Sequence, residues 1–259
     1  MKCLKSIASM ILLIGSMVCA WFVLPVQAAE FTPAQQNEIR SLIKDYLIKN
    51  PEILQEAMSE LEKRQADNEK AAQSKALAEW MPVLLKSGRS TVLGNPKGDV
   101  TLIEFFDYNC GYCKRALSDL QKLTDADKNL RIIIRDFPVL GPDSVEAAMV
   151  GVAARQQLSG AKYMDFHVKL LESKGRIGKD RAFAVAKELN VDLQKLQKDM
   201  DLSETRSILS ETMQIGDALR LQGTPAYLIG NEVIFGAVGF DSLKQAVDST
   251  RRCGKAQCS

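Results

Sequence analysis

Two cysteines at the junction of an apolar strand and a helix constrain the fold of this sequence more than any other feature. The segment "VTLIEFFDY", residues 100–108, has the mostly apolar pattern of a strand buried on both faces. Cys110 and Cys113 follow, and a helix is expected from there to about Asp125. "LRIIIRDFPV", residues 130–139, is the next apolar run. Strand, helix and strand in this order predict a βαβ unit with parallel strands.

The rest of the chain extends this α/β pattern. Helical periodicity without a clear strand runs from about 143 to 221 and predicts a helical insertion. "PAYLIGNEVIFGA" then holds two short apolar runs around Gly230-Asn231, which predict a hairpin. "FDSLKQAVDSTRR" is a closing amphipathic helix. The expected domain, residues 89–259, therefore has the order βαβ, helical insertion, ββα, after the turn-rich boundary "SGRSTVLGNPKGD".

Residues 29–88 predict a helical arm. Thr32 is a suitable N-cap, and Pro33 suits the first helical position. Apolar residues then recur at helical spacing: Ile39, Leu42, Ile43, Tyr46, Leu47, Leu54, Met58 and Leu61. Two interpretations remain open. The arm either folds back on the domain or is an oligomerisation stalk that buries its stripe against copies of itself.

The first 28 residues have the composition of a secretory signal. Lys2 and Lys5 precede an uncharged run, and small residues precede the expected cleavage point. An uncleaved membrane anchor is the alternative, whereas the residues before Cys19 form a poor lipoprotein signal. Loss of the two lysines leaves 32 basic residues against 32 acidic ones. This balance makes nucleic acid and anionic membranes poor candidates for partners.

Four cysteines remain after such cleavage, in two local pairs far apart in sequence. An exported chain meets an oxidising compartment, so two intrachain disulfides are expected, one of them reactive. Cys253 and Cys258 at the C-terminus suit a structural disulfide. A second redox pair, free thiols or bonds between chains are the alternatives.

For Cys110 and Cys113, redox chemistry is weighed against metal binding. Structural zinc needs four ligands, and the chain has a single histidine, His167. A copper site is harder to exclude. A helix N-terminus, however, offers free N–H groups and a positive dipole end that stabilise a thiolate. Cys110 is therefore the expected exposed nucleophile, and Cys113 the buried thiol that resolves mixed disulfides.

Together these segments resemble the thioredoxin fold and, with the insertion and the signal, the DsbA family of thiol:disulfide oxidoreductases. The motif "IEFFDYNCGYC" carries the resemblance, and "GTPAY" resembles the family's Thr–cis-Pro loop. The resemblance implies that Thr224 and Pro225, with Gly111 and Tyr112, contact substrate. Glu104 matches the family's buried acid, although a strand in the opposite register would turn it to water. His167 then falls on an insertion helix, as a packing or surface residue.

The resemblance also implies a function. Gly111-Tyr112 is similar to the dipeptide of periplasmic isomerases, and the arm resembles the Com1/ScsC-like branch. The expectation is a periplasmic enzyme that forms or isomerises disulfides, without cofactor or metal, and association with the envelope is the alternative location. Its expected partners are exported proteins with free or mispaired cysteines, a membrane redox protein and further copies of itself. A copper-handling thiol protein is the alternative. A third hypothesis, an interaction protein whose thioredoxin domain is an inactive scaffold, is disfavoured because a scaffold would not need Cys110, Cys113, Thr224 and Pro225 together.

Overall fold

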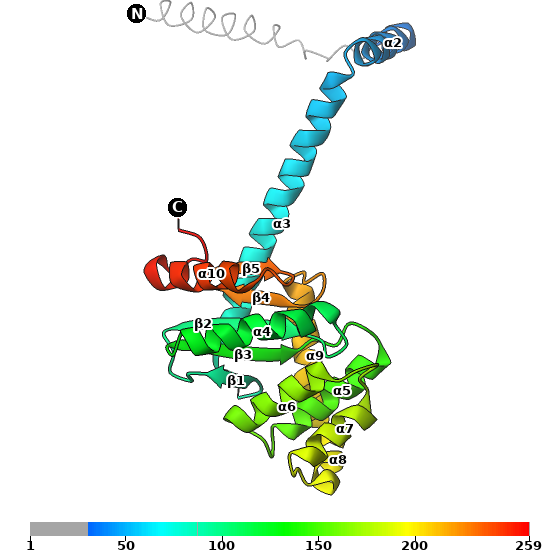
Figure 1. Cartoon of the computed structure of the whole chain (residues 1–259). Coiled ribbons are helices and arrows are strands. Elements are labelled where there is room, and N and C mark those ends of the chain that lie inside the picture. Colours follow the sequence, from blue (N-terminus) through cyan, green and yellow to red (C-terminus); the bar gives the residue numbers. More distant parts are fainter. Residues whose placement is uncertain (1–30, 87, 259) are drawn as a thin grey trace, which may run out of the picture. The chain divides into compact units, whose positions relative to one another are not determined.

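The computed structural model describes residues 31–86 and 88–258 (Figure 1). The expected signal, residues 1–28 with Cys3 and Cys19, lies outside these residues. The chain divides into two compact units, Met1–Arg64 and Gln65–Ser259. The elements, in chain order, are α2 (Pro33–Lys49), α3 (Glu52–Lys86), β1 (Thr91–Gly94), β2 (Val100–Phe106), α4 (Gly111–Ala126), β3 (Leu130–Asp136), α5 (Pro142–Ala154), α6 (Gly160–Glu172), α7 (Lys179–Glu188), α8 (Leu193–Asp201), α9 (Ser203–Ala218), β4 (Ala226–Ile229), β5 (Glu232–Phe235) and α10 (Phe240–Cys253).

Five strands form one sheet in the order β1-β3-β2-β4-β5. Strands β2 and β3 are parallel and are connected through α4, which confirms the predicted βαβ unit. Strand β4 runs antiparallel to β2 and to β5. Gly230, with φ of 56°, lies in the turn of the predicted β4–β5 hairpin. The order is that of the expected thioredoxin fold with its insertion, to which one edge strand, β1, is added.

Strand β1 was not predicted. Residues 91–94 pair antiparallel with β3 at the sheet edge, inside the segment interpreted as a turn-rich boundary. The turn signals belong to the residues that follow. A Cβ at Gly94 or Gly98 would lie 2.6 and 2.4 Å from the backbone oxygens of Leu130 and Asn129. These glycines, one at the end of β1 and one after it, allow the chain to pass close to the start of β3, and they make the short strand hard to recognise from the sequence.

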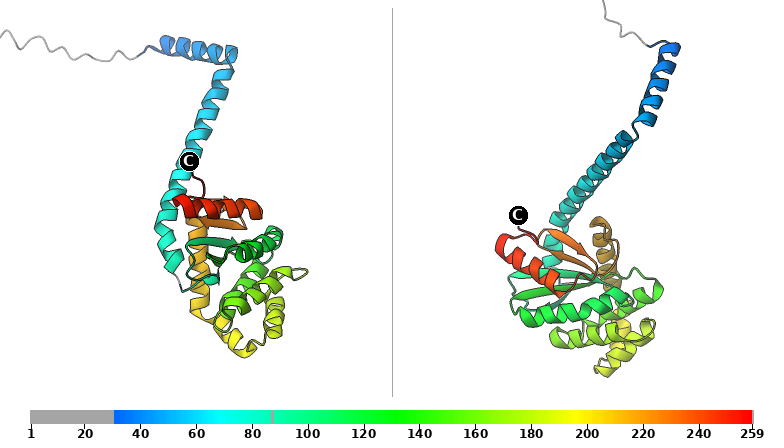
Figure 2. Two further views of the ribbon diagram at one scale, coloured as in Figure 1. Left: turned by 60° about the vertical axis from the view of Figure 1, so that its left-hand side comes forward. Right: turned by 45° about the horizontal axis from the view of Figure 1, so that its top comes forward.

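Helices cover both faces of the sheet (Figure 2). On one face, α4 and α10 pack on alternate residues of β2 such as Leu102 and Phe106. On the other face, Ile103 and Phe105 pack in a second apolar cluster with residues of α3 and α9. Because successive strand residues point to opposite faces, this near-continuous apolar run fills two cores at once.

Helix α3 contributes to the second core through its last third. Leu77 and Leu84 are buried there, with Trp80 partly buried beside them. Gln73 also donates a hydrogen bond to the Leu219 carbonyl at the end of α9. The part of α3 after Arg64 thus belongs to the second compact unit, where its apolar residues pack in the second core. The sequence did not separate these parts because one uninterrupted helix contains both.

The first unit contains α2 and the start of α3. Thr32 caps α2 and forms a capping box with Gln35, as the sequence indicates. The predicted apolar stripe is largely solvent-exposed within the chain, with Leu42 at 70% and Met58 at 63%. A run of exposed apolar side chains of this extent is unusual for a helix that has no further contact.

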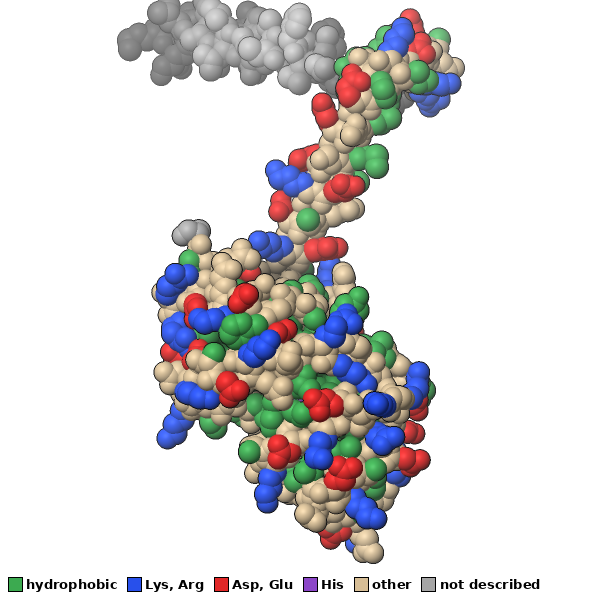
Figure 3. Space-filling model, viewed as in Figure 1, with side chains coloured by type: hydrophobic (Ala, Val, Ile, Leu, Met, Phe, Trp, Pro, Cys, Tyr) green, Lys and Arg blue, Asp and Glu red, His purple; other side chains and the backbone are tan. Residues whose placement is uncertain are grey.

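The helical insertion consists of α5 to α9. These helices pack on one another, and α5 and α9 also pack on β3. Among the residues that the structure describes, no helix is long and apolar enough to cross a membrane. The face of the second unit in Figure 3 shows basic and acidic side chains intermixed, in keeping with the balanced charge of the sequence.

Candidate active site

Cys110 is the N-cap residue of α4. Strand β2 ends at Phe106, and a turn closed by a hydrogen bond from Cys110 N to the Asp107 carbonyl (3.0 Å) leads into the helix. The Cys110 sulfur accepts a hydrogen bond from Cys113 N at 3.4 Å. This is the geometry in which an N-terminal helix amide stabilises a thiolate. The expectation that Cys110 is exposed is wrong for most of its surface, since only 5% is accessible.

The loop before β4 supplies the opposite side of the site. The Thr224–Pro225 peptide bond is cis, as the resemblance implied. The Cys110 sulfur lies 3.0 Å from the Thr224 carbonyl oxygen, to which the protonated thiol donates. The structure therefore brings Cys110, Cys113, Thr224 and Pro225 together from segments more than a hundred residues apart.

The surroundings act on the two thiols in opposite directions. The pKa of Cys110 is lowered to about 5, first by a hydrogen bond from the Cys113 side chain, then by Thr224 and by backbone N–H groups of α4, against the effect of burial. Burial raises the pKa of Cys113 well above its usual range, and Cys110 and the Glu104 carboxylate add to the rise. At neutral pH, Cys110 is the thiolate and Cys113 the thiol.

Glu104 is buried at 4% exposure, which confirms the expected register and excludes the alternative that it faces water. It lies in β2 opposite Tyr227 of β4. Burial raises the pKa of Glu104 to about 8, the charge of Cys110 adds to this, and the Tyr227 phenol opposes it. A carboxyl group that titrates near neutral pH beside Cys113 is suited to carry that thiol's proton.

An open cavity of about 290 Å³ adjoins the pair. Tyr112, 59% exposed, lies at one side, and Thr224, Pro225 and Phe235 line the other. The Arg115 guanidinium lies 4.2 Å above the Tyr112 ring. A Cβ at Gly111 would meet nothing within 4 Å, so this position is open to an approaching chain. The expected substrate-contacting residues thus border one surface.

His167 is a packing residue, as expected. It is buried in α6 against the Phe106 and Tyr108 rings. Burial lowers its pKa to about 3, so the ring is neutral. Within the described residues, no group of three or more His, Cys, Asp or Glu side chains is arranged to hold a metal ion.

The C-terminal cysteines form a disulfide, Cys253–Cys258. Gly254 adopts the left-handed conformation that ends α10 and starts the loop. Ala256, inside this loop, is buried against the backbone near Gly230, where an added Cβ would lie 3.0 Å from Ala256 N. The disulfide therefore closes a loop that packs on the β4–β5 turn.

Sequence reasoning missed three polar residues around the pair: Asp107, Asn109 and Ser144. Asp107 and Asn109 lie inside the recognised motif, where two Asx residues before a helix indicate a local turn. Ser144 lies in α5, and nothing in the sequence connects it with the cysteines. Their hydrogen bonds to residues 30 to 70 positions away became visible only in the structure.

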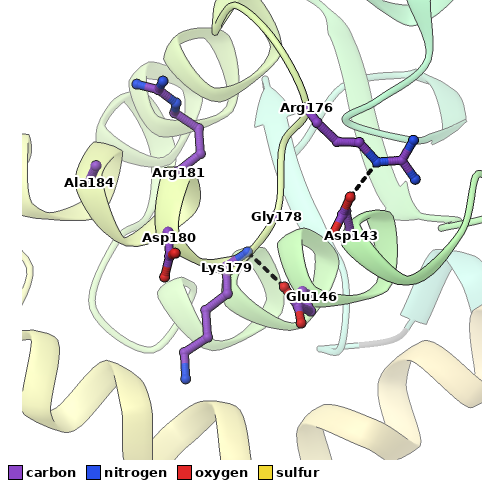
Figure 4. A pocket seen from close by; sticks show the side chains of 8 residues that line it. All are labelled: Asp143, Glu146, Arg176, Gly178, Lys179, Asp180, Arg181 and Ala184. Carbon is purple, nitrogen blue, oxygen red and sulfur yellow. Dashed lines mark hydrogen bonds and ion pairs between the residues drawn. The ribbon is translucent and has the colours of Figure 1, made fainter.

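A larger cavity, of about 590 Å³, lies in the insertion (Figure 4). Its side chains carry both charges, and two contacts join them: the Arg176 side chain pairs with Asp143, and Lys179 N donates to Glu146. One contact is an ion pair and the other comes from the Lys179 backbone N–H, so both occupy carboxylates of the lining, and we assign no ligand to this cavity.

The sheet, the cysteine pair at the start of α4 and the cis-proline loop define a thioredoxin-fold protein with a dithiol site. The model of the DSBA-like thioredoxin domain matches residues 101–248, more than half of the chain, and the chain therefore belongs to this family. A second model, described as the copper resistance protein ScsC N-terminal domain, matches residues 35–67.

Solved structures agree with this assignment. A thioredoxin-like oxidoreductase from Silicibacter pomeroyi DSS-3 is 39% identical, over 66% of this chain and 96% of that one, with a TM-score of 0.62. Proteus mirabilis ScsC in a transitional conformation is 30% identical, over 86% of this chain and 99% of that one, with a TM-score of 0.64.

Among curated proteins, the chain is similar to Na(+)/H(+) antiporter NhaA 1 of Salinispora arenicola (strain CNS-205). The two are 26% identical over 163 residues, which are 62% of this chain and 24% of the antiporter. The chain thus spans about a quarter of the length of this curated relative.

Proposed function

We propose that the protein is a thiol:disulfide oxidoreductase that forms or isomerises disulfide bonds in exported proteins. The observation that carries the proposal is the Cys110 sulfur, held at the α4 N-terminus and facing the cis Thr224–Pro225 bond. The lowered pKa of Cys110 and the raised pKa of Cys113 support Cys110 as the attacking thiol and Cys113 as the resolving thiol.

In oxidation, a client thiolate attacks the Cys110 sulfur of the Cys110–Cys113 disulfide, and Cys113 leaves with the electron pair of the broken bond. Glu104 supplies the proton that Cys113 takes up. A second client thiolate then attacks the client sulfur of the mixed disulfide and releases Cys110 as a thiolate. The client loses two electrons, and the pair gains them.

In isomerisation, the reduced Cys110 attacks a mispaired client disulfide, and a different client thiolate later displaces Cys110. The pair finishes reduced, so no net electrons are transferred. The low pKa of Cys110 keeps it in the attacking thiolate form at neutral pH and also makes it a good leaving group when the client thiolate displaces it.

The test is catalysis by the oxidised and the reduced protein. Oxidised protein is mixed with reduced ribonuclease, and reduced protein with scrambled ribonuclease, and regained ribonuclease activity is followed. We expect both rates to exceed the uncatalysed rates. Absence of acceleration in both assays would rule out the proposal.

The arm supports a further part of the proposal, namely that the protein is a homo-oligomer in the periplasm. The exposed apolar stripe of the first unit would be buried against other copies. Several sites around one client favour isomerisation over simple oxidation. A membrane redox protein would reset the pair. Fractionation of cells that express the whole chain would test the location.

Copper handling is the second candidate, because the model matched by residues 35–67 is described as part of a copper resistance protein. Two adjacent thiols are suitable ligands for Cu(I). Anaerobic titration of the reduced protein with Cu(I) separates the candidates. Tight one-to-one binding without ribonuclease activity would favour copper handling.

A further inference from the structure

Asp107 is a buried carboxylate with four hydrogen-bond donors around it. Its Oδ1 accepts from Ser144 Oγ (2.7 Å) and from Asn109 N (2.8 Å). Its Oδ2 accepts from the backbone N–H groups of Val139 and Leu140, at 2.9 and 3.0 Å. A carboxylate that accepts several backbone N–H bonds fixes the segments that donate them. Asp107 therefore joins the turn before α4 to the segment between β3 and α5.

Asn109 joins the same turn to a third segment. Its Nδ2 donates to the Ile177 carbonyl (2.8 Å) and to Ser144 Oγ (3.0 Å), and its Oδ1 accepts from Ile177 N (2.8 Å). Ile177 lies between α6 and α7. The exchange of two hydrogen bonds with one backbone unit sets both the position and the orientation of the Asn109 side chain.

Both residues lie directly beside the cysteines. The Asp107 carbonyl accepts from Cys110 N at 3.0 Å, and Asn109 directly precedes Cys110. The contacts of Ser144 and Ile177 with Asn109 thus lie one residue from Cys110, and the contact of Ser144 with Asp107 lies three residues from it. We call Asp107, Asn109 and Ser144, with the Ile177 backbone, the clasp.

We infer that the clasp residues Asp107, Asn109 and Ser144 are positioning residues that hold the Cys110 sulfur against the α4 N-terminus and the Thr224 loop. This inference rests on the proposed function and deepens it. The helical insertion thereby has a role in the chemistry, because it supplies Ser144 and Ile177 and so fixes a turn that belongs to the thioredoxin unit.

The surroundings of the clasp fit this role. Ser144 and Ile177 are each preceded by a residue of the ion pair Asp143–Arg176 at the edge of the cavity in Figure 4. That ion pair joins the two insertion segments on their exposed side. The buried hydrogen bonds of the clasp then connect these segments to the turn before α4.

The first test is Ser144→Ala, which removes one buried hydroxyl and leaves the carboxylate and the amide in place. The matched control is Thr212→Val in α9, which removes another buried hydroxyl, one that donates to the Ile208 carbonyl away from the pair. Alkylation of Cys110 in the reduced protein is measured against pH, with melting temperature measured beside it. The titratable side chains that act on the Cys110 thiol, Cys113 and Glu104, are unchanged in both variants.

We expect comparable losses of melting temperature in the two variants. In Ser144→Ala alone, the midpoint of the alkylation profile should move up by about one pH unit, toward that of an ordinary thiol near 8.5. Disulfide exchange with a small disulfide such as oxidised glutathione should slow by about tenfold at neutral pH, since displacement of a reacting group is costly.

Asp107→Asn is the second variant. The amide nitrogen of asparagine cannot accept hydrogen bonds, so it would face two of the four donors that now surround the carboxylate. It should shift the profile further than Ser144→Ala. The inference is overturned if both variants fold and keep the wild-type profile and exchange rate, or if Thr212→Val shifts the profile equally. The alkylation profile is measured without a client protein. Failure of the proposed function would appear instead as wild-type protein that is inactive in the ribonuclease assays, so the two outcomes are distinguishable.

Discussion

Cys110 and Cys113 are separated by one helical turn, yet only the first has helix N–H groups and a partner thiol as hydrogen-bond donors. The second is enclosed by apolar side chains and the Glu104 carboxyl. The difference comes from position in the helix: the N-cap residue meets free N–H groups, and the residue one turn later meets the core. Equal residue types thus acquire unequal chemistry.

Substitution of each cysteine should separate attack from resolution. We expect Cys110→Ser to reduce disulfide exchange to the uncatalysed level, because no thiolate remains at the helix N-terminus. Cys113→Ser should keep the attack and accumulate mixed disulfides with clients. Non-reducing electrophoresis and intact mass measure both. Near-normal turnover of Cys110→Ser would show that the nucleophile is misassigned.

The pH dependence of stability gives a test of Glu104. Its pKa of about 8 in the folded protein lies above 4.5, so between these values the folded state retains a proton that the unfolded state has lost, and stability falls as pH rises. The pKa of Cys110, lowered from 9.0 to about 5, has the opposite effect: its contribution to stability grows as pH rises through the same range. In the reduced wild type, the two trends oppose each other.

We therefore expect reduced Glu104→Gln to gain stability from pH 5 to pH 8, by on the order of 1–4 kcal/mol. Cys110→Ser should lose stability over that range, and oxidised wild type, which has no free Cys110 thiol, should follow it. Urea unfolding at several pH values measures these slopes. Parallel curves for all four proteins would contradict the assigned pKa shifts.

At the scale of elements, α3 contains residues with different roles along one helix. Leu84 is fully buried under the sheet, whereas Leu54 in the same helix is 49% exposed. We expect Leu84→Ala to destabilise the second unit by about 2–5 kcal/mol, as for other buried leucines. Leu54→Ala, the same chemical change in the same helix, should leave the melting temperature of that unit nearly unchanged. Equal losses of stability in the two variants would contradict the burial of Leu84 in the second core.

The sequence indicated the elements whose signals are local. The run before Cys110, the hairpin at Gly230-Asn231 and the apolar helices have periodicity or turn residues of their own. Strand β1 does not, because its four edge residues, the last of which is Gly94, give too short a pattern. The clasp does not either, since its contacts join residues that only tertiary folding brings together. Leu77 and Leu84 follow a polar helical stretch that gives no sign of where packing begins.

At the scale of the molecule, the boundary at Arg64 and Gln65 allows a sharper truncation than the sequence alone suggested. A chain that begins at Gln65 keeps Leu77 and Leu84, so we expect a folded monomer that oxidises clients. A chain that begins at Arg89 loses both and exposes the face with Ile103 and Phe105, so it should melt at lower temperature and aggregate.

The full chain should be a multimer, since each buried apolar side chain of the stripe contributes roughly 1.5–3 kcal/mol. Light scattering on the full chain and both truncated forms measures mass, and scrambled ribonuclease measures isomerisation. Loss of isomerisation with retained oxidation in the Gln65 form would support the stalk. A monomeric full chain at micromolar concentration would contradict it.

The disulfide at the end of α10 has a consequence for electron counting. In the structure Cys110 and Cys113 are free thiols, whereas Cys253 and Cys258 form a disulfide and are both exposed. Each pair is a two-electron couple, so reduction of both described pairs from their disulfide forms takes about four electrons, although turnover uses about two. A bulk redox titration would therefore average two potentials. Peptide mass mapping after thiol labelling, which reports Cys110–Cys113 apart from Cys253–Cys258, yields the potential of the working pair.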